Sequence, residues 1–514
     1  MDNPAERNHF FRTGRTTKVP LMAHFRTQKS HYIYDAGTNE IVLVPTDFWE
    51  ASRPRAFGQP GSYLSPGSFS GNGSQRPRVT ELLTSDLKTA RDSGLFGTKR
   101  PRGRSLFLSK KQFAQKTRQH LSQLILCITE RCNLRCLYCP YSASYPHQRQ
   151  HGSRGMSFET ARQAVDFFLA HSKKAEHRFI SFYGGEPTLN MPIVRKIVEY
   201  TRCKCGSSVS FNMTTNGYNL PEETLKFLVD QNFLIVVSVD GPADQHDKYR
   251  RTIGQHPTHG GVLKTLVRLR TMAWDDCISR LRLSIVIAPP YDIRRLKLYF
   301  DNDPLFQDIG FGVTMVASAT KHFFSNQKVQ EALEVKLPFD TKFEAMFQEY
   351  KQNLINNTPY KSRFLAAIFE MRFLRLHKRI LHNGYSDLIY ANGICEPGIR
   401  RLYVTCDGRF TICEKANNTL EIGNLEEGID SEKVFGILTG FIRNLDRQCT
   451  RCFANRLCSV CFASDFSSKD FYPGDLESEC ARIREDLNTN LIAYCQVLES
   501  NPRAFDFMQD ITLE

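Results

Sequence analysis

With 514 residues, a formal net charge of +14 and 16 cysteines, the chain is long enough for two to four domains with true hydrophobic cores. No apolar run reaches the roughly 18–20 residues of a membrane span and no secretory segment opens the chain, so we expect no membrane partner. The cysteines cluster in metal-like spacings, which favours reduced thiols and a cytoplasmic location over a secreted disulfide scaffold.

The N-terminal quarter is basic. Residues 1–120 hold 20 Lys and Arg against 9 Asp and Glu, so +11 of the net charge lies there. A region of this kind attracts acidic partners, either nucleic acid or an acidic peptide. Residues 31–34 and 41–44 flank a turn at 36–39 and predict a β-hairpin. Fifteen of the 27 residues from 52 to 78 are Gly, Pro or Ser, which predicts a flexible insertion.

From about residue 122 to 318, short β-rich apolar runs alternate with amphipathic segments. The runs are 124–128, 179–183, 209–213, 234–239, 283–287 and 312–316. Ser157 is a good N-cap for a helix over 158–171, and Pro221 suits the first helical position of another. Six such units predict an α/β fold with a parallel sheet and right-handed crossovers, and six are too few for an eight-unit barrel.

The remaining third of the chain reads differently. Residues 340–385 predict helix and form a bridge, and residues 481–498 predict a C-terminal helix. Between them, residues 395–480 are rich in cysteine and short on long periodic segments, so we expect no long helix there.

Three cysteines stand directly after the apolar run 124–128, in the order Cys132-x3-Cys136-x2-Cys139. Three thiolates on one short loop can hold three corners of a cubane iron–sulfur cluster and leave the fourth iron open. A cluster held by protein alone would show a fourth cysteine in register, but Pro140 follows instead. The alternative is a zinc knuckle, because C-x2-C pairs are common zinc elements.

This spacing resembles the signature of radical S-adenosylmethionine (SAM) enzymes, in which an aromatic residue, here Tyr138, precedes the third cysteine. The resemblance implies a [4Fe–4S] cluster whose open iron is chelated by SAM. It further implies that an electron from the cluster cleaves SAM to methionine and a 5′-deoxyadenosyl radical. The fold that it implies is an open, partial (β/α)6 barrel.

The Gly184-Gly185-Glu186 segment follows the run 179–183. The glycines allow close backbone approach to a ligand, and the glutamate offers an anionic partner for an ammonium group. The alternative is an ordinary Gly-rich turn between strand and helix. At this distance after the cysteines, the segment resembles the family element that contacts the SAM amino group.

Two further strand ends carry polar residues. Asn216 follows the run 209–213 and is a candidate polar contact near SAM. Ser238 opens a Ser-x-Asp-Gly-Pro element that is followed by a His-Asp pair and Arg250, which resembles the SPASM-bearing part of the family. The resemblance implies that Ser238 and Arg250 bind the SAM carboxylate and ribose, with Arg251 an adjacent alternative. An arginine fork suits a carboxylate.

A second cysteine array has its own order and resembles the SPASM domain, which carries two auxiliary [4Fe–4S] clusters. Its members are Cys395, Cys413, Cys449, Cys452, Cys458, Cys461 and Cys480. The resemblance implies that Cys449, Cys452, Cys458 and Cys480 hold one cluster. Cys395, Cys413 and Cys461 then hold three corners of the other, and Cys406 or a substrate thiolate is a candidate fourth ligand. Two residues rather than the usual three precede Cys461, which departs from the family pattern, and zinc is the alternative metal.

Glu414 directly follows Cys413. In anaerobic sulfatase-maturating relatives an aspartate at the corresponding place acts as a base during oxidation, so Glu414 is a candidate catalytic base. The alternative interpretation is an exposed surface glutamate.

Radical SAM enzymes with SPASM domains mostly modify peptides or proteins. The resemblance therefore implies an oxidoreductase that matures a ribosomally made precursor peptide, by installing a thioether or carbon–carbon crosslink after hydrogen abstraction from a C–H bond. Its partners would be the leader and core of that peptide and an electron donor such as flavodoxin or ferredoxin. One alternative is oxidation of a Cys or Ser to formylglycine in a sulfatase. Another is a zinc-binding nucleic-acid module, which no RNA-recognition motif supports.

We therefore expect five regions. A basic region, with the hairpin and possible leader-peptide recognition by β-strand addition, is followed by the partial barrel, the helical bridge, the SPASM domain, and a C-terminal helix and tail. Their predicted ranges are 1–120, 121–320, 321–390, 391–485 and 486–514.

Overall fold

The computed structural model describes residues 20–52, 80–81, 92–141, 149–272, 278–316, 339–390, 395–415, 420–461 and 476–511. The chain forms two compact units. The first unit comprises Met1–Arg104, Arg379–Tyr390 and Asp446–Arg456, and the second comprises Ser105–Lys378, Ala391–Leu445 and Leu457–Glu514. The predicted flexible insertion lies, apart from Ser52, outside the described residues.

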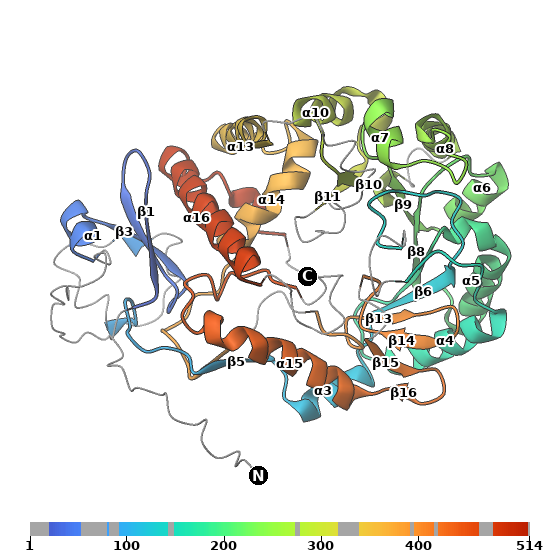
Figure 1. The fold of residues 1–514 in the computed structure, drawn as a ribbon, viewed down its shortest axis with the longest axis horizontal. Helices are drawn as coiled ribbons and strands as arrows, with labels where there is room; N and C mark the ends of the chain where they lie inside the picture. The colour runs from blue at the N-terminus through green and yellow to red at the C-terminus, as the bar shows by residue number, and fades with distance from the viewer. Residues whose placement is uncertain are drawn as a thin grey trace, which may run out of the picture. The chain divides into compact units, whose positions relative to one another are not determined.

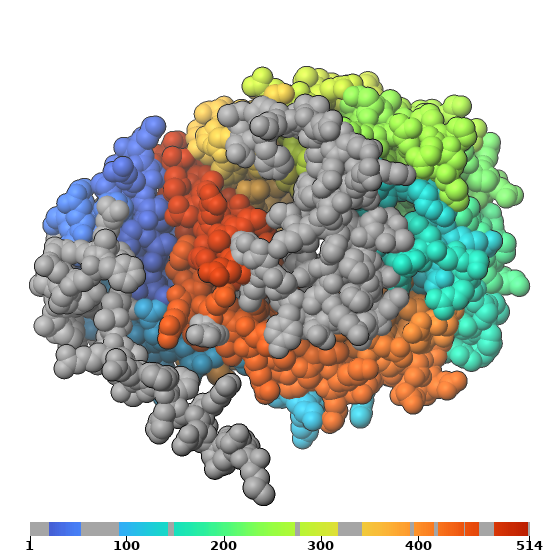
Figure 2. Space-filling view, in the orientation of Figure 1, coloured from blue at the N-terminus to red at the C-terminus, as the bar shows by residue number. Residues whose placement is uncertain are grey.

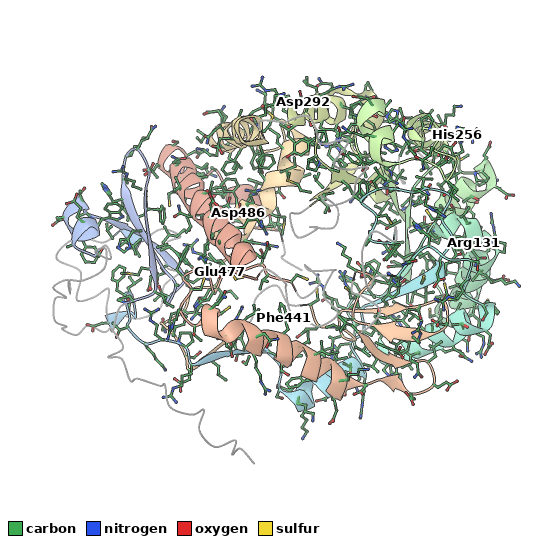
Figure 3. All side chains as sticks on the ribbon, in the orientation of Figure 1. Arg131, His256, Asp292, Phe441, Glu477 and Asp486 are labelled. Atoms are coloured by element: carbon green, nitrogen blue, oxygen red, sulfur yellow. The ribbon has the colours of Figure 1, made fainter. Side chains whose placement is uncertain are left out.

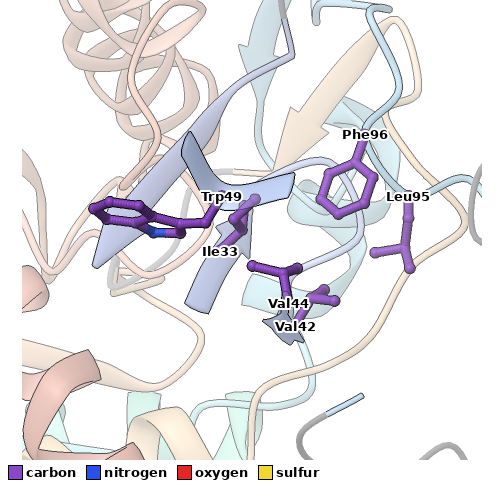
Figure 4. Close-up of a cluster of buried hydrophobic side chains, with 6 residues drawn as sticks. All are labelled: Ile33, Val42, Val44, Trp49, Leu95 and Phe96. Carbon is purple, nitrogen blue, oxygen red and sulfur yellow. The ribbon is translucent and has the colours of Figure 1, made fainter. Parts of the chain in front are cut away.

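The first unit contains a sheet with the strand order β1-β2-β3-β4. Strands β2 (His31–Asp35) and β3 (Glu40–Val44) pair antiparallel, so the predicted hairpin is confirmed. Strand β1 (Met22–Arg26) pairs antiparallel with β2, and β4 (Thr80–Glu81) pairs parallel with β3. One face of the hairpin and helix α1 (Thr46–Ser52) bury a cluster that includes Ile33, Val42 and Trp49 (Figure 4).

Three separate chain segments are joined in this unit by one arginine. The Arg456 guanidinium donates to the carbonyl oxygens of Ala36 and Gly37 in the hairpin turn, at 2.9 and 3.0 Å. It also donates to the carbonyl oxygen of Gly384 at 3.1 Å. Short strands β5 (Gly103–Ser105) and β12 (Leu388–Tyr390) form a two-stranded sheet. The hairpin turn is thus part of the packed structure of the first unit.

The second unit is built on six parallel strands that follow one another in chain order. They are β6 (Gln123–Thr129), β7 (Phe179–Gly184), β8 (Ser210–Thr215), β9 (Leu234–Ser238), β10 (Leu281–Ile287) and β11 (Gly310–Met315). All six predicted runs are strands. In Figure 1, the connecting helices lie along the outer side of these strands. Those helices are α4 (Phe158–His171), α5 (Met191–Cys205), α6 (Glu222–Asp230), α7 (Ala243–Tyr249), α8 (His259–Met272) and α10 (Ile293–Asn302).

Local sequence signals fix the helix starts. The Ser157 side chain accepts a hydrogen bond from the Thr160 amide at 3.0 Å, and α4 begins at Phe158, as predicted. Pro221 is the N-cap of α6 rather than its first helical residue, so this prediction was wrong by one position. Its extended ψ of 146° places it outside the helix. Short helices lie at Lys110–Thr117 (α3), Pro187–Asn190, Ile278–Arg280, Pro304–Phe306 and Asp506–Met508.

The sheet continues past β6 with strands from the cysteine-rich region. Strand β13 (Arg401–Val404) pairs parallel with β6, and β14 (Arg409–Thr411), β15 (Glu421–Asn424) and β16 (Gly428–Ile429) follow antiparallel. A 19-residue helix, α15 (Ser431–Cys449), comes next. The prediction of no long helix at 395–480 was therefore wrong. The cysteines obscured a clear helical period, in which Val434, Leu438, Phe441, Ile442 and Leu445 are buried.

Three helices pack together at the other end of the six strands. They are α13 (Phe339–Ile355), α14 (Arg363–His377) and α16 (Leu476–Ser500). The predicted helical bridge is split, because Asn357 has a φ of +57° and Ser362 caps a new helix through the Leu365 amide. Figure 2 shows the surfaces of α13 and α16 on the same face. Within the described ranges, none of the helices combines the length and apolar character that a bilayer crossing needs.

Candidate functional site

The three-cysteine loop follows β6 at the carboxyl edge of the parallel strands. Cys132, Cys136 and Cys139 are all free and partly buried. Burial raises the pKa of Cys132 and of Cys139 to about 12, and Cys136 adds to both shifts. Because the ligand form of cysteine is the thiolate, metal binding must remove these protons. Among the described residues, no three His, Cys, Asp or Glu side chains converge as a finished metal site. The assignment of a cluster to this loop therefore rests on the motif.

The backbone of this loop is held by the segment that follows α7. The Arg135 amide donates to the Arg251 carbonyl at 2.7 Å, and the Leu137 amide donates to the Tyr249 carbonyl at 3.0 Å. The Ile253 amide donates back to the Asn133 carbonyl at 3.2 Å. These three hydrogen bonds hold the backbone of the cysteine loop against residues 249–253. The conformation of the loop therefore does not depend on its cysteine side chains alone.

Gly184 and Gly185 are required by the chain's own backbone. Gly184 has a φ of +132°, and a Cβ there would collide with the Thr129 carbonyl oxygen. A Cβ at Gly185 would lie 2.6 Å from the carbonyl carbon of Arg131 and 2.8 Å from the carbonyl oxygen of Glu130. The sequence predicts that the two glycines let the backbone approach a ligand. In the structure they let the backbone pack against residues 129–131, which connect β6 to the cysteine loop.

The Glu186 carboxylate is buried and almost fully hydrogen-bonded. Its Oε1 accepts from the Thr188 amide at 3.1 Å and from the hydroxyls of Thr188 and Thr215 at 2.7 Å each. Its Oε2 accepts from the Asn216 amide at 2.7 Å. Burial raises the pKa of Glu186, and these hydrogen bonds oppose the rise. They also fix the carboxylate in place and leave Oε2 with capacity for one more donor.

Asn216 joins this group to the cysteine loop. Its side-chain amide donates to Asn133 Oδ1 at 2.8 Å, and its own Oδ1 accepts from the Tyr218 amide at 3.0 Å. Both ends of the Asn216 amide are therefore engaged by protein groups, which makes it a support for the loop.

Tyr138, Asp240 and Arg250 form one buried polar group next to the cysteine loop. The Tyr138 hydroxyl donates to Asp240 Oδ2 and accepts from Arg250 Nη1 at 2.8 Å. Arg250 Nη1 lies 4.0 Å from Asp240 Oδ2, and the Val286 amide donates to Asp240 Oδ1 at 3.0 Å. The Nε of Arg250 is buried and has no hydrogen-bond partner among the described residues. A buried guanidinium donor without an acceptor fits the carboxylate or ribose oxygen of a ligand.

The rest of the Ser-x-Asp-Gly-Pro motif supports this group. His246 Nδ1 accepts from the Asp240 amide at 3.3 Å, and its Nε2 lies 3.1 Å from the Thr258 hydroxyl. Asp247 Oδ1 accepts from the amides of Thr258 and His259 at the start of α8. The half-buried Ser238 ends β9. The His-Asp pair therefore positions the backbone, while Ser238 stays a predicted ligand contact.

Glu414 lies in a second polar group, above β6, β7 and β13. Its side chain is 13% exposed, so the alternative of an exposed surface glutamate was wrong. Arg401 Nη1 lies 3.5 Å from Oε1, while Oε2 is buried and has no partner in the part of the chain that the structure describes. The Glu414 carbonyl accepts from the Tyr141 hydroxyl at 2.6 Å and from Arg149. The Glu414 main chain is thus fixed while one carboxylate oxygen still needs a donor.

Arg149 was not found by the sequence analysis. Its guanidinium carbon stands 4.3 Å from the ring centre of Tyr141 and 4.2 Å from that of Tyr403, so it is stacked between two aromatic faces. Arg149 stands ten residues after Cys139 and belongs to no motif, so only the fold reveals it.

The structure places Cys406 against β6. Its Sγ lies 3.6 Å from the Sγ of Cys127 and 3.0 Å from the Cys127 carbonyl oxygen. Cys127 is thus more than an apolar packing residue, and its thiol is a close neighbour of the candidate fourth ligand.

The other cysteines of the second array belong to different parts of the fold. Cys449 ends α15 and accepts from Arg104 Nη1 at 3.1 Å, and the Cys452 amide donates to the Cys449 carbonyl at 3.2 Å. The first unit contains this pair, and the second contains Cys395, Cys413, Cys458, Cys461 and Cys480. The predicted auxiliary clusters and the SPASM assignment stay predictions.

Residues 126–286 match the radical SAM superfamily. These residues include the cysteine loop, the Gly-Gly-Glu segment and the Tyr138–Asp240–Arg250 group. This segment of the chain is therefore similar to radical SAM domains, which agrees with the resemblance found in the sequence.

Individual relatives are similar over smaller or more distant stretches. A cysteine-type anaerobic sulfatase-maturating enzyme of Clostridium novyi (strain NT) is 32% identical over 133 residues, which are 25% of this chain and 35% of that protein. The radical SAM cyclopropyl synthase TigE of Paramaledivibacter caminithermalis is 21% identical over 303 residues, 57% of this chain and 54% of that protein. The first curated relatives are matched over only 35% to 39% of their own length.

The fold is also similar to that of a solved structure. Native anSMEcpe with bound AdoMet aligns with a TM-score of 0.50 at 20% identity, covering 76% of this chain and 100% of that one. This likeness concerns the fold alone, and it agrees with the α/β arrangement described above.

Proposed function

We propose that this protein is a radical SAM oxidoreductase that modifies a peptide or protein. The observation that carries the proposal is the buried Tyr138–Asp240–Arg250 group with an unpaired arginine donor, placed beside three cysteines at the carboxyl edge of parallel strands. This is where α/β folds place their sites. Two relatives, a sulfatase-maturating enzyme and a cyclopropyl synthase, support the reaction class.

The residues divide into two roles. Cys132, Cys136 and Cys139 would hold three irons of a [4Fe–4S] cluster, with SAM on the fourth. When bound, cluster and SAM supply a 5′-deoxyadenosyl radical that abstracts a hydrogen atom from a C–H bond. Arg250 Nε would donate to an oxygen of SAM, Glu186 Oε2 would accept from its ammonium group, and Ser238 would be a further contact.

Glu414 takes the second role. Its unpaired Oε2 is an acceptor for a proton of the substrate, and Tyr141 and Arg149 hold its main chain in place. General-base groups of this kind contribute about 10²- to 10⁴-fold to a rate. Cys395, Cys413, Cys449, Cys452, Cys458, Cys461 and Cys480 would hold two auxiliary clusters that accept the electron left on the substrate.

The substrate that we propose is a ribosomally made precursor peptide, in which the enzyme installs a thioether or carbon–carbon crosslink. Strand β1 forms one edge of the described sheet in the first unit, and β-strand addition there would bind the leader. The basic charge of residues 1–120 would attract an acidic leader. Flavodoxin or ferredoxin would supply electrons in the cytoplasm. Oxidation of Cys or Ser to formylglycine is the second candidate. It is supported because a cysteine-type and a serine-type sulfatase-maturating enzyme are similar in sequence to part of this chain.

The test is anaerobic reconstitution with iron and sulfide, followed by dithionite and SAM. We expect 5′-deoxyadenosine, and we expect Cys136→Ala to abolish it. The matched control is Cys203→Ala, which changes an exposed cysteine of α5. SAM cleavage that persists in Cys136→Ala, or a colourless protein that contains only zinc, would refute the proposal and favour the zinc-binding module.

Mass spectrometry of a co-expressed precursor separates the two substrates. A crosslink of either kind removes two hydrogens and joins two residues, so fragment ions between those residues disappear. Formylglycine changes one residue and leaves the fragment series continuous.

A further inference from the structure

A cavity of about 240 Å³ lies between α14, α16 and the loop at 457–459, all within the second unit. Its polar lining consists of Arg372, Arg375, Ser459, Arg482, Asp486 and Asn490. Figure 3 labels Asp486 on α16, about midway along the helix. The cavity is separate from the radical SAM site, and nothing described so far uses it.

The two carboxylates nearest this cavity are already engaged. Arg482 Nη1 donates to Asp486 Oδ2 at 2.8 Å. Arg482 also donates from Nε and Nη2 to both oxygens of Glu479, at 3.0 and 2.6 Å. Arg482 therefore has its acceptors. The described lining holds three arginines and one acid, Asp486, which Arg482 already engages.

In the described lining, the two charges without a carboxylate acceptor are those of Arg372 and Arg375. Among the described residues, no carboxylate accepts a hydrogen bond from either guanidinium. Arg372 is partly enclosed, with its guanidinium carbon 5.4 Å from the ring centre of Phe369. Burial lowers the pKa of Arg372, and Arg482 adds to the lowering, although Asp486 opposes it. An enclosed cation beside a second cation is stabilised by a bound anion.

A second polar group in the wall also lacks a partner. The Oδ1 atom of Asn490 is buried and accepts no hydrogen bond from the residues that the structure describes. A ligand that carries a hydroxyl or an acid proton beside its anionic oxygens would satisfy Asn490 and the two arginines together. The apolar remainder of the wall consists of Met371, Leu376, Leu457, Ile483 and Leu487. Apolar surroundings strengthen charge–charge interactions by lowering the local dielectric constant.

We propose that this cavity is a binding site for an oxyanion, the carboxylate of a small acid or a phosphate, held by Arg372 and Arg375. The planar guanidinium fork matches two oxygens of either group. The volume has room for a small dicarboxylate or a phosphate ion. This site does not depend on the proposed function, because the radical chemistry can fail while the site remains.

The experiment is calorimetric titration of the full, reconstituted protein with glutarate and, separately, with inorganic phosphate, at constant chloride concentration. We expect saturable binding of one of them at one site per chain. Tighter binding of glutarate assigns the site to carboxylates, and tighter binding of phosphate assigns it to phosphates. Absence of saturable binding of both probes overturns the proposal.

Variants show whether the binding belongs to this cavity. Arg372→Gln should weaken binding about tenfold or more, the effect of losing a charge-assisted pair. Arg484→Gln is the matched control, because it removes an arginine of the same helix, α16, that does not line the cavity. Arg375→Gln changes an exposed side chain and serves if Arg372→Gln fails to fold. Unchanged affinity in the folded arginine variants refutes the site.

Discussion

The ion pair between Asp240 and Arg250 gives the sharpest test of how the site is built. Both side chains are buried, with 1% and 6% of their surface exposed. Replacing Asp240 by Asn keeps the shape and removes one charge. The Asn oxygen can still accept from the Val286 amide, and the Asn amide can donate to the Tyr138 hydroxyl. The change therefore isolates the electrostatic contribution of the carboxylate to Arg250.

The separation of 4.0 Å sets the magnitude. Two unit charges at this distance interact by about 4 kcal/mol at an effective dielectric constant of about 20. Removing one partner of a buried pair typically destabilises a protein by about 3–5 kcal/mol, because the other charge stays buried alone. We expect the free energy of unfolding of Asp240→Asn to fall by about 3–4 kcal/mol.

Urea unfolding followed by circular dichroism measures this change. The matched control is Asp244→Asn, which breaks an ion pair with Arg295 whose two side chains are 62% and 58% exposed. Surface pairs of this kind contribute about 0–1 kcal/mol. If the two variants lose the same stability, the buried group does not stabilise the site as we argue.

Three further predictions concern the loop, pH and the second polar group. Gly185→Ala should destabilise the protein by about 1–3 kcal/mol and lower the iron bound per chain. Gly260→Ala, where a Cβ meets no atom within 4 Å, should leave bound iron unchanged, and equal iron content in the two variants would contradict the argument. Burial, with the Arg250 charge adding to it, lowers the pKa of His246 to about 2, whereas the unfolded value is about 6.5. The unfolded chain therefore binds more protons below pH 6.5, and this contribution to stability should fall by about 2 kcal/mol from pH 7 to pH 5. Urea midpoints at the two pH values should show this loss in the wild type but not in His246→Asn, and identical losses would refute it. Glu414→Gln should reduce peptide product at least about 100-fold while 5′-deoxyadenosine still forms. Glu426→Gln, an exposed control, should not change the yield, and full product from Glu414→Gln would remove the base assignment.

Much of the α/β arrangement of the second unit could be predicted from the sequence. The six strands are where the apolar runs lie, and α4 has its predicted ends because Ser157 caps it and its apolar period faces the sheet. These signals are local, since each depends on residues within a few positions of one another. The predicted Gly-Gly-Glu and Ser-x-Asp-Gly-Pro segments lie at strand ends for the same reason.

Other features escaped prediction because they depend on distant contacts or on patterns hidden by other signals. The helical period of α15 lies in a cysteine-rich region and ends at Cys449, so its apolar spacing competes with a metal-binding pattern. Arg149 stands outside every motif and acquires its role only between the rings of Tyr141 and Tyr403. The residues next to Glu414 in the sequence give no sign that its side chain is buried. It is enclosed only because β13 pairs with β6.

The sequence by itself determined the spacing of three thiols, the positions of the strands along the chain and the polar residues at their ends. Each of these features can be recognised from residues that are close together in the sequence. The tertiary structure decided which of these groups meet. Tyr138 and Asp240 are 102 residues apart, and Arg149 reaches the Glu414 carbonyl across 265 residues. Such contacts follow from the pairing and register of strands, which bring distant residues to one edge of the sheet and which no local pattern encodes.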